Sequence, residues 1–296
     1  MRIIASLLLL MNIAGLSRAA TTISPLNRFS FAANLGWMEV RGDDANGAVI
    51  GEVICSGFIY AANAGWIHLG NGAPADGIRY QNNSGTDFGV NHDGLGNLRG
   101  YAYGANIGWL TFTNRDETGA IFDGPRVDLA TGRMSGFIWS ANCGWISLTN
   151  RFAFVQTDTI RMGADSDGDG IPDAWERLKF GNLAAANGTS DLDGDGFPDL
   201  NEYRADTEPS DPNSNLRITY YSAEPGGFSA KMEWTSVATR QYRVLMRTEV
   251  NSGFAWREVG LGLIVPDTGS TTTRNVIDSG SPQRFFRVEA SRPLSP

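Results

Sequence analysis

Phe137-Ile-Trp-Ser-Ala-Asn-Cys-Gly-Trp-Ile146 is one of four copies of a ten-residue unit that decides the fold of the first half of the chain. Each copy reads aromatic, any residue, aromatic, two further residues, Asn, any residue, Gly, Trp and an aliphatic residue. The copies start 29, 43 and 36 residues apart, which indicates tandem structural repeats with loops of variable length. The other three copies are Phe29–Met38, Phe58–Ile67 and Tyr101–Leu110.

Each unit reads as strand, turn and strand. Aromatic residues two positions apart face the same side of a strand. The sequence Asn-x-Gly is typical of tight turns, because both Asn and Gly tolerate a positive φ. Trp145 and Ser147 then alternate with Ile146 and Leu148 in the next strand. One such meander cannot bury its apolar face alone, whereas four can. We therefore expect a four-fold β-meander domain over residues 20–160, closed as a small propeller, a sandwich or a stacked array.

The repeated tryptophans, Trp37, Trp66, Trp109 and Trp145, are expected in the core, because large aromatic side chains dominate core energetics. The alternative is a row of exposed rings that stack on sugars. The repeated asparagines are expected to serve as turn residues. The unit resembles a Gly-Tyr-Ala-Trp-Ser-x-Asn-x-Gly-Trp-Ile repeat of secreted bacterial proteins over roughly residues 29–150. That resemblance implies a repeat fold and no particular activity.

Two acidic loops lie in residues 161–212. This segment carries thirteen acidic and four basic residues, so it accounts for the whole negative net charge of −8 of the chain. Both loops place carboxylates at positions 1, 3, 5, 9 and 12 and Gly at position 6, the ligand pattern of a twelve-residue calcium loop, with a backbone carbonyl at position 7. The predicted ligands are Asp165, Asp167, Asp169, Ile171, Asp173 and Glu176, and then Asp191, Asp193, Asp195, Phe197, Asp199 and Glu202.

Calcium is the ion that this pattern favours. It takes six to eight oxygen ligands at a loose radius, whereas magnesium prefers fewer carboxylates and more retained water. Zinc is disfavoured because residues 161–212 contain no His or Cys. We expect two calcium ions, with Asp206, Glu208 and Asp211 as conceivable additional ligands.

The loops resemble those of thrombospondin type 3 repeats, dockerins and EF-hands. A helix is expected after each loop, over residues 172–180 with Gly181 as a stop, and over residues 198–205. The sequence departs from a paired EF-hand because no helix signal precedes either loop. Position 8 is also Pro in both loops, Pro172 and Pro198, and Pro has no N–H to join the loops. The resemblance nevertheless implies dockerin-like docking as one alternative.

Residues 213–290 predict an antiparallel β-sandwich. Short alternating runs such as Ala230, Met232 and Trp234 are separated by Gly, Ser, Asn and Thr clusters. The region resembles a fibronectin type III or immunoglobulin-like module with Trp234 in its core. Residues 211–215 read as the linker before it, and residues 291–296 as a tail.

Residues 1–19 read as a signal peptide, because Arg2 precedes an apolar run and small residues stand before a cleavage point near Ala19. We therefore expect a secreted or cell-surface protein without a membrane span. The acidic balance argues against nucleic-acid binding. Cys55 and Cys143 can pair in an oxidising compartment, but their spacing alone does not decide this.

The sequence thus predicts a mainly β, calcium-binding, non-enzymatic protein used for binding, adhesion or surface structure. Its partner is an unidentified protein or glycan. A carbohydrate-binding accessory protein is the second hypothesis. A hydrolase that uses Asp43, Asp44 or Asp93 is the third, although no pair of these acids has a recognisable catalytic pattern.

Overall fold

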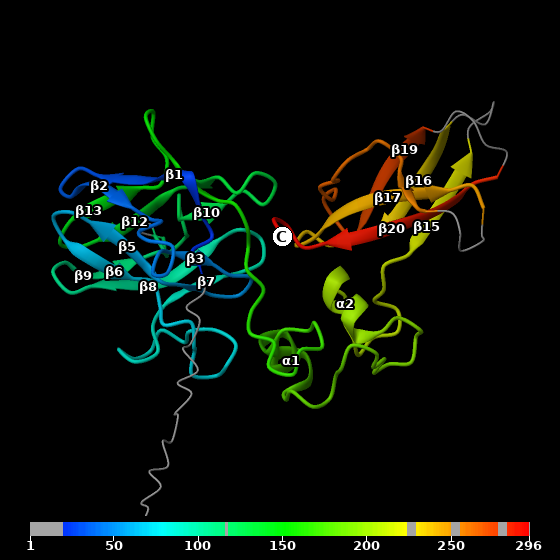
Figure 1. Ribbon diagram of the computed structural model, residues 1–296, viewed down its shortest axis with the longest axis horizontal. Helices are drawn as coiled ribbons and strands as arrows, with labels where there is room; N and C mark the ends of the chain where they lie inside the picture. Colours follow the sequence, from blue (N-terminus) through cyan, green and yellow to red (C-terminus); the bar gives the residue numbers. More distant parts are fainter. Residues whose placement is uncertain (1–19, 116–117, 224–228, 250–254, 278–282, 296) are drawn as a thin grey trace, which may run out of the picture.

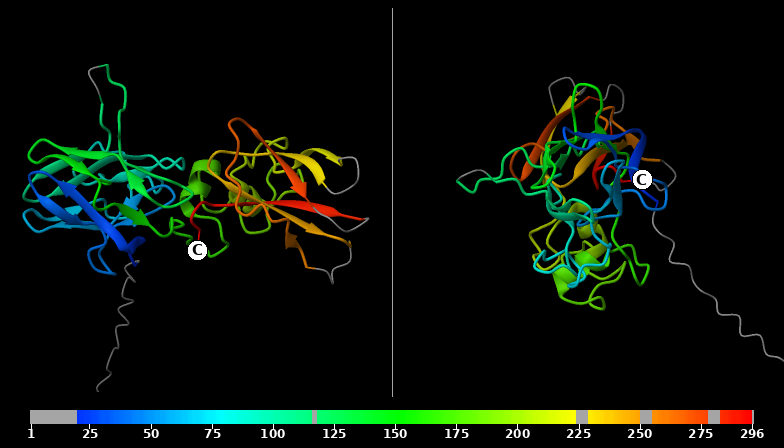
Figure 2. Two further views of the ribbon diagram at one scale, coloured as in Figure 1. Left: turned by 90° about the horizontal axis from the view of Figure 1, so that it is seen from above. Right: turned by 90° about the vertical axis from the view of Figure 1, so that its left-hand side faces the viewer.

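The computed structural model describes residues 20–115, 118–223, 229–249, 255–277 and 283–295. The predicted signal peptide lies outside the described residues. The protein is mainly β, with 40% strand and 6% helix, which confirms the predicted class. A barrel lies at one end, two three-stranded sheets lie at the other, and residues 161–212 lie between them along one side (Figures 1 and 2).

The four repeats form a closed eight-stranded barrel, an arrangement that differs from the propeller, sandwich or stacked array considered from the sequence. Each repeat supplies one hairpin, and each hairpin pairs with the hairpin of the next repeat. The circle closes where β13 pairs with β1. The barrel strands are β1 (Ile23–Ala32), β2 (Gly36–Glu39), β5 (Phe58–Ala61), β6 (Gly65–His68), β8 (Leu98–Gly104), β9 (Gly108–Thr111), β12 (Phe137–Ser140) and β13 (Gly144–Ser147).

Shorter strands lie in the connections between the hairpins, and one more follows the last hairpin. β14 pairs with β1, β7 pairs with β8, and two further pairs join β3 to β4 and β10 to β11. Their bounds are β3 (Val49–Ile50), β4 (Cys55–Ser56), β7 (Val90–His92), β10 (Arg126–Val127), β11 (Met134–Ser135) and β14 (Val155–Thr157).

The interior of the barrel is filled by small and aliphatic side chains. The residue after each repeated Trp is at most 1% exposed, and these residues are Met38, Ile67, Leu110 and Ile146. The cavity at the centre measures about 10 Å³, roughly the volume that one water needs. The interior of the barrel is therefore a packed core.

The repeated tryptophans lie on the outside of the barrel, so the expectation that they form the core is wrong. Their exposed fractions run from 43% to 48%. Each Trp faces the second aromatic residue of its own repeat across the hairpin, as in Phe31 and Trp37. The alternation of a strand explains this, because an inward aliphatic residue forces its neighbour outward. The interior of an eight-stranded barrel is also just wide enough for side chains to fill it.

The repeated asparagines do more than form turns. The Nδ2 of each Asn donates a hydrogen bond to the carbonyl of the residue after the Asn of the preceding repeat. The bonds join Asn63 to Leu35, Asn106 to Ala64, Asn142 to Ile107, and Asn34 to Cys143, at 3.0 to 3.1 Å. A closed ring of four side-chain bonds therefore ties the hairpin ends together.

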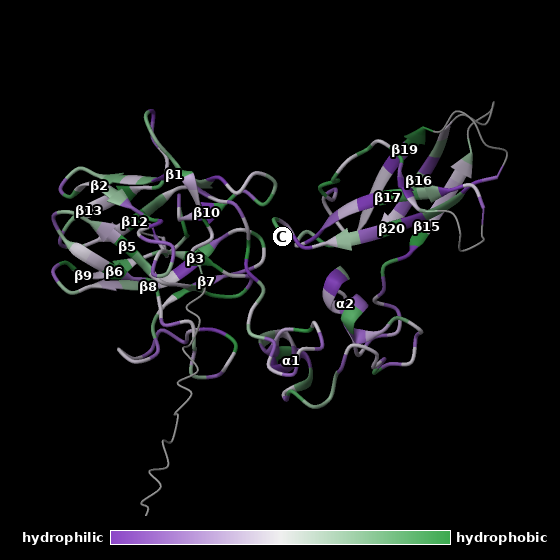
Figure 3. Cartoon of the chain, viewed as in Figure 1, coloured by the Kyte–Doolittle hydropathy of each residue, from purple (hydrophilic) through white to green (hydrophobic). Residues whose placement is uncertain are grey.

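The C-terminal region contains two three-stranded antiparallel sheets around one core. Trp234 is fully buried there beside Tyr242, as expected. Hydrophobic and hydrophilic residues alternate along β20 (Figure 3). One sheet holds β15 (Ile218–Ala223), β16 (Ser229–Thr235) and β19 (Thr271–Ile277), and the other holds β18 (Arg257–Glu258), β17 (Gln241–Arg247) and β20 (Phe285–Ser291).

The residues after β20 return to the barrel. The Ile160 N–H donates to the carbonyl of Leu294 at 3.0 Å, and the Leu294 side chain packs against the barrel core.

Cys55 and Cys143 are both buried and unpaired. No helix in the described part of the chain is long and apolar enough to span a membrane.

Candidate metal centre

The two acidic loops are each followed by one short helix, as the sequence predicts. The helices are α1 (Asp173–Phe180) and α2 (Asp199–Ala205), and Gly181 ends α1 with a φ of +75°. Proline stands just before each helix, where its missing N–H costs nothing. A small hydrophobic core around Ile171, Trp175 and Tyr203 holds the helices together.

The first loop draws its acidic side chains toward one point. Oxygens of Asp165, Asp167 and Asp169 all lie within 4.8 Å of one another. Asp165 accepts hydrogen bonds from the backbone N–H groups of Gly168 and Gly170, at 2.8 and 3.0 Å. These bonds curl the backbone around the Asp165 carboxylate, and both glycines have positive φ values that other residues rarely adopt.

The second loop repeats this geometry. Oxygens of Asp191, Asp193 and Asp195 also lie within 4.8 Å of one another. Asp191 accepts bonds from Gly194 and Gly196, both at 2.9 Å. The loop pattern predicts a sharp turn only at the glycine of position 6, but the glycine at position 4 also has a positive φ in both loops. The repeated Asp-Gly-Asp-Gly was the signal for it.

The glutamate at position 12 is buried beside each aspartate cluster. Glu176 and Glu202 are each 1% exposed. Neither oxygen of Glu176 receives a hydrogen bond from any part of the chain that the structure describes. One oxygen of Glu202 accepts from the Thr207 hydroxyl at 3.2 Å, and the other has no such bond within the described residues. A buried, ionised carboxylate oxygen without a partner is costly, so these two glutamates are residues that could hold a cation together with the aspartates.

The electrostatics lead to the same conclusion. Burial, and then the charges of the neighbouring aspartates led by Asp167, raise the pKa of Glu176 to about 7. Burial likewise raises the pKa of Glu202 to about 7, against the opposing hydrogen bond from Thr207. Each shift reflects burial of the carboxyl group first and the nearby aspartate charges second, and both act against its ionised form. A divalent ion at this point would favour the ionised form.

The aspartates at position 9 have other partners. Both oxygens of Asp173 accept bonds from Ser166, one from its N–H and one from its hydroxyl. Asp199 accepts in the same way from the Leu192 N–H and the Ser190 hydroxyl. These bonds hold the loop against the start of its helix. Direct or water-mediated ligation by Asp173 and Asp199 stays a prediction.

The sequence predicts one backbone ligand in each loop, the carbonyl of position 7. The Ile171 side chain is fully buried in the small core, whereas Phe197 is 37% exposed. The second loop has one further difference, because Asn215 donates from Nδ2 to Asp195 at 2.8 Å. The sequence predicts only a linker at residues 211–215, so this contact of Asn215 does not follow from it.

The conceivable additional ligands are engaged elsewhere. Asp206 ends α2 with a φ of +56°, and Glu208 pairs with Lys179 at 2.6 Å. Asp211 accepts from its neighbour Asn213. The two loops are not joined through the backbone of position 8 as in a paired EF-hand. Residues 161–212, all of which the structure describes, contain no strand.

The acids considered for hydrolysis stabilise their own loops. Asp43 accepts from the N–H groups of Ala45 and Asn46, and Asp44 pairs with Arg41. Asp93 accepts from Leu95 and Asn97.

In comparisons with known proteins, no family model, curated protein or solved structure matches this chain.

Proposed function

We propose that the chain is a secreted, calcium-binding, non-enzymatic protein in which two calcium ions order residues 161–212 as a rigid connector between the barrel and the C-terminal sheets. In this proposal the two β regions, a repeat domain and a fibronectin type III-like module, serve binding, adhesion or surface structure. The observation that carries it is the pair of buried glutamates, Glu176 and Glu202, each beside three converging aspartates.

The ligands would be the cluster of three aspartates and the position-12 glutamate of each loop, with the carbonyls of Ile171 and Phe197. Calcium supplies positive charge and no redox or acid–base chemistry, so its contribution here is to hold the loops closed. Without the ion, the closed conformation of the loops is unfavourable because their carboxylates repel one another. The free energy of metal binding therefore contributes to the free energy of folding. Extracellular sites of this kind bind calcium at about 10⁻⁴–10⁻³ M and would stay loaded outside a cell.

Limited proteolysis with and without a chelator tests the proposal. We expect cleavage between Met162 and Tyr203 to be rapid in chelator and slow in millimolar calcium. Magnesium at the same concentration should protect less. Equal cleavage of this segment in calcium and in chelator would refute the proposal, provided that the barrel stays intact in both.

A carbohydrate-binding role is the second candidate, and the exposure of the aromatic rings favours it. Tyr60 and Trp66, and Tyr103 and Trp109, form pairs with centroids 4.9 and 5.0 Å apart on the outer surface. Phe88 contacts His68 of one repeat and Trp109 of the next, with ring centroids 5.6 and 5.0 Å apart. Exposed rings of this kind stack on the apolar faces of sugars.

A glycan array with Trp66→Ala and Trp109→Ala variants tests the second candidate. Binding that is lost in the variants while the fold is retained supports it. Binding that both variants keep, or no binding by the parent protein, counts against it.

A further inference from the structure

Tyr203 lies where the two calcium loops meet. It directly follows Glu202 of the second loop, and its ring packs edge-on against Trp175, with centroids 5.7 Å apart. Trp175 directly precedes Glu176 of the first loop. Both position-12 glutamates are therefore one residue away from the same aromatic contact, so the position of Tyr203 depends on both loops.

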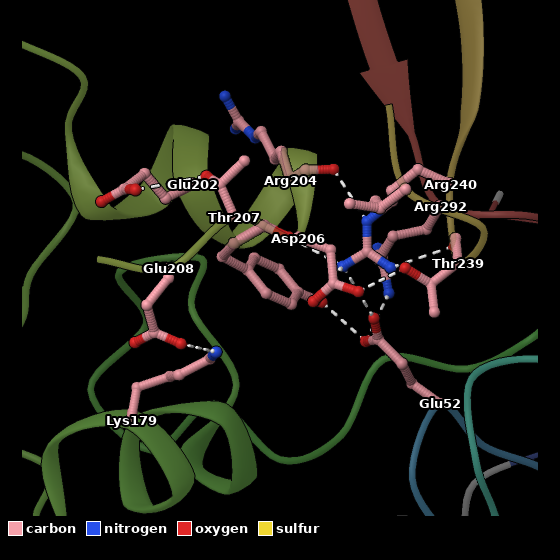
Figure 4. A network of polar contacts seen from close by, with 12 residues as sticks. Glu52, Lys179, Glu202, Arg204, Asp206, Thr207, Glu208, Thr239, Arg240 and Arg292 are labelled. Carbon is pink, nitrogen blue, oxygen red and sulfur yellow. Dashed lines mark hydrogen bonds and ion pairs between the residues drawn. The ribbon is translucent and has the colours of Figure 1, made fainter. Parts of the chain in front are cut away.

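The Tyr203 hydroxyl reaches the barrel. It donates a hydrogen bond to Oε2 of Glu52 at 2.7 Å. Glu52, which is labelled in Figure 4, belongs to the segment between β3 and β4. Glu52 also pairs with two arginines of the C-terminal region, Arg240 at 3.5 Å and Arg292 at 3.3 Å. One carboxylate of the barrel thus touches both the connector and the C-terminal sheets.

Arg240 holds the end of α2 from the other side. It is 5% exposed and donates to the carbonyls of Tyr203 and Arg204, at 2.8 and 2.9 Å. Both carbonyls belong to the last helical turn, where backbone acceptors run short of intrahelical donors. The Tyr203 carbonyl also accepts from the Asp206 N–H at 3.3 Å. The hydroxyl of the neighbouring Thr239 donates to Asp206, the residue that ends α2. The guanidinium groups of Arg240 and Arg292 also lie 6.0 and 5.8 Å from the Tyr203 ring.

We propose that Tyr203 couples calcium binding to the docking of the barrel and the C-terminal sheets onto the connector. This inference rests on the proposed function. When calcium occupies the loops, α2 is held in place, and its last-turn carbonyls and the Tyr203 hydroxyl complete the contacts of Arg240 and Glu52. Without calcium, the buried glutamates favour opening of the loops, and the three regions lose their common contact.

Linkage makes the coupling reciprocal, because a contact that calcium strengthens must also strengthen calcium binding by the same factor. A change in the barrel should therefore weaken calcium binding, although the barrel contributes no ligand. Glu52→Gln is the informative variant, since Glu52 is about 150 positions from Tyr203 in sequence and outside both loops. It removes the charge that Tyr203, Arg240 and Arg292 share.

The experiment measures calcium binding by titration calorimetry on the purified protein and on three variants. Tyr203→Phe removes one hydrogen bond and should bind calcium about fivefold more weakly. Glu52→Gln removes the charge that makes its bonds to Tyr203, Arg240 and Arg292 charge-assisted, and it should weaken calcium binding by a similar factor. Tyr220→Phe is the matched control, because Tyr220 lies on the exposed face of β15, and it should bind as the parent does. X-ray scattering of the parent protein should show a larger radius of gyration in chelator than in calcium.

The outcomes separate this inference from the proposed function. If the parent binds two calcium ions but Glu52→Gln binds them equally well, Tyr203 is only a structural contact and the coupling is wrong. If Tyr203→Phe alone is weaker, the effect is local to the second loop and the coupling is again wrong. If the parent binds no calcium, the proposed function fails, and the coupling fails with it.

Discussion

The Nδ2 of Asn34 donates to the carbonyl of Cys143 at 3.1 Å, and this bond joins the first repeat to the fourth. The two residues are 109 positions apart, so the bond forms only when the barrel is closed. Together with the pairing of β13 with β1, it makes the four repeats a single closed unit.

Replacing Asn34 by Ala should destabilise the barrel by about 1–2 kcal/mol, because the Cys143 carbonyl then loses its donor. Urea unfolding measures this. Asn83→Ala is the matched control, since Asn83 is exposed in a loop, and it should have little effect. Equal stabilities of the two variants would show that the bond from Asn34 to Cys143 contributes nothing.

Replacing Glu176 by Gln should have opposite effects with and without calcium. Without calcium, the change removes a buried charge, so the thermal stability of residues 161–212 should rise or stay level. With calcium, the affinity of the first loop should fall about tenfold or more, because a charged ligand is lost. Glu249→Gln makes the same chemical change at an exposed site and should alter neither measurement. A variant that binds calcium like the parent would remove Glu176 from the site.

Calcium binding should release protons at pH 6. The pKa of Glu176 and of Glu202 is about 7 in the folded, calcium-free protein, above the value of about 4.5 expected when unfolded. A raised carboxyl pKa contributes stability that is present below pH 4.5 and is lost as the pH rises through 7. Calcium needs the ionised form and displaces these protons. Calorimetry in buffers of different ionisation enthalpy should detect the release at pH 6 and little of it at pH 8.

His92 should make the stability of the barrel fall in acid. Its Nε2 accepts from the Gly96 N–H at 3.1 Å, so Nδ1 carries the proton toward the Gly51 carbonyl. Burial lowers the pKa of His92, against the opposing charges of Asp93 and Glu52. The unfolded chain then binds a proton below about pH 6.5 that the folded chain resists, so stability present above pH 6.5 is lost as the pH falls, by up to about 1.4 kcal/mol per pH unit.

The His92→Gln variant isolates this contribution. Its unfolding free energy should depend less on pH between 7.5 and 5.5 than that of the parent, with calcium saturating throughout. Parallel pH profiles for the two proteins would contradict the assignment of a neutral, buried His92.

The two faces of a barrel strand should respond differently to truncation. Leu110→Ala removes an inward side chain and should cost about 2–5 kcal/mol. Trp109→Ala removes a side chain that is 47% exposed and should cost less than half of that. Denaturant unfolding of both variants makes the comparison, and a larger loss for Trp109→Ala would contradict the orientation of β9.

Much of the fold could be predicted from local patterns. The repeats, their Asn-x-Gly turns and the stop of α1 at Gly181 follow from backbone preferences that a short stretch of sequence displays. The closure of the barrel does not, because it depends on the pairing of β13 with β1 across the whole domain. The bond from Asn34 to Cys143 is equally non-local, and the asparagines therefore read only as turn residues.

The orientation of the tryptophans follows from a local pattern in the sequence. Ile146 and its equivalents are all aliphatic, and strand alternation then places Trp145 on the opposite face. The expectation of a tryptophan core rests on the general preference of aromatic residues for cores. In this barrel the alternation of the strand prevails over that preference. In the acidic loops the residues that converge were predictable from spacing alone, whereas the bonds of Asp173 to Ser166 and the contact of Tyr203 with Glu52 needed three-dimensional information.

The most direct test of the central claim is a calorimetric titration of the purified protein with calcium, after chelator treatment and dialysis. The account predicts saturable heat with a stoichiometry of two ions per chain, reduced to one ion when Asp165 and Asp167 are both replaced by Asn. Heat no greater than that of dilution, up to several millimolar calcium, would contradict it.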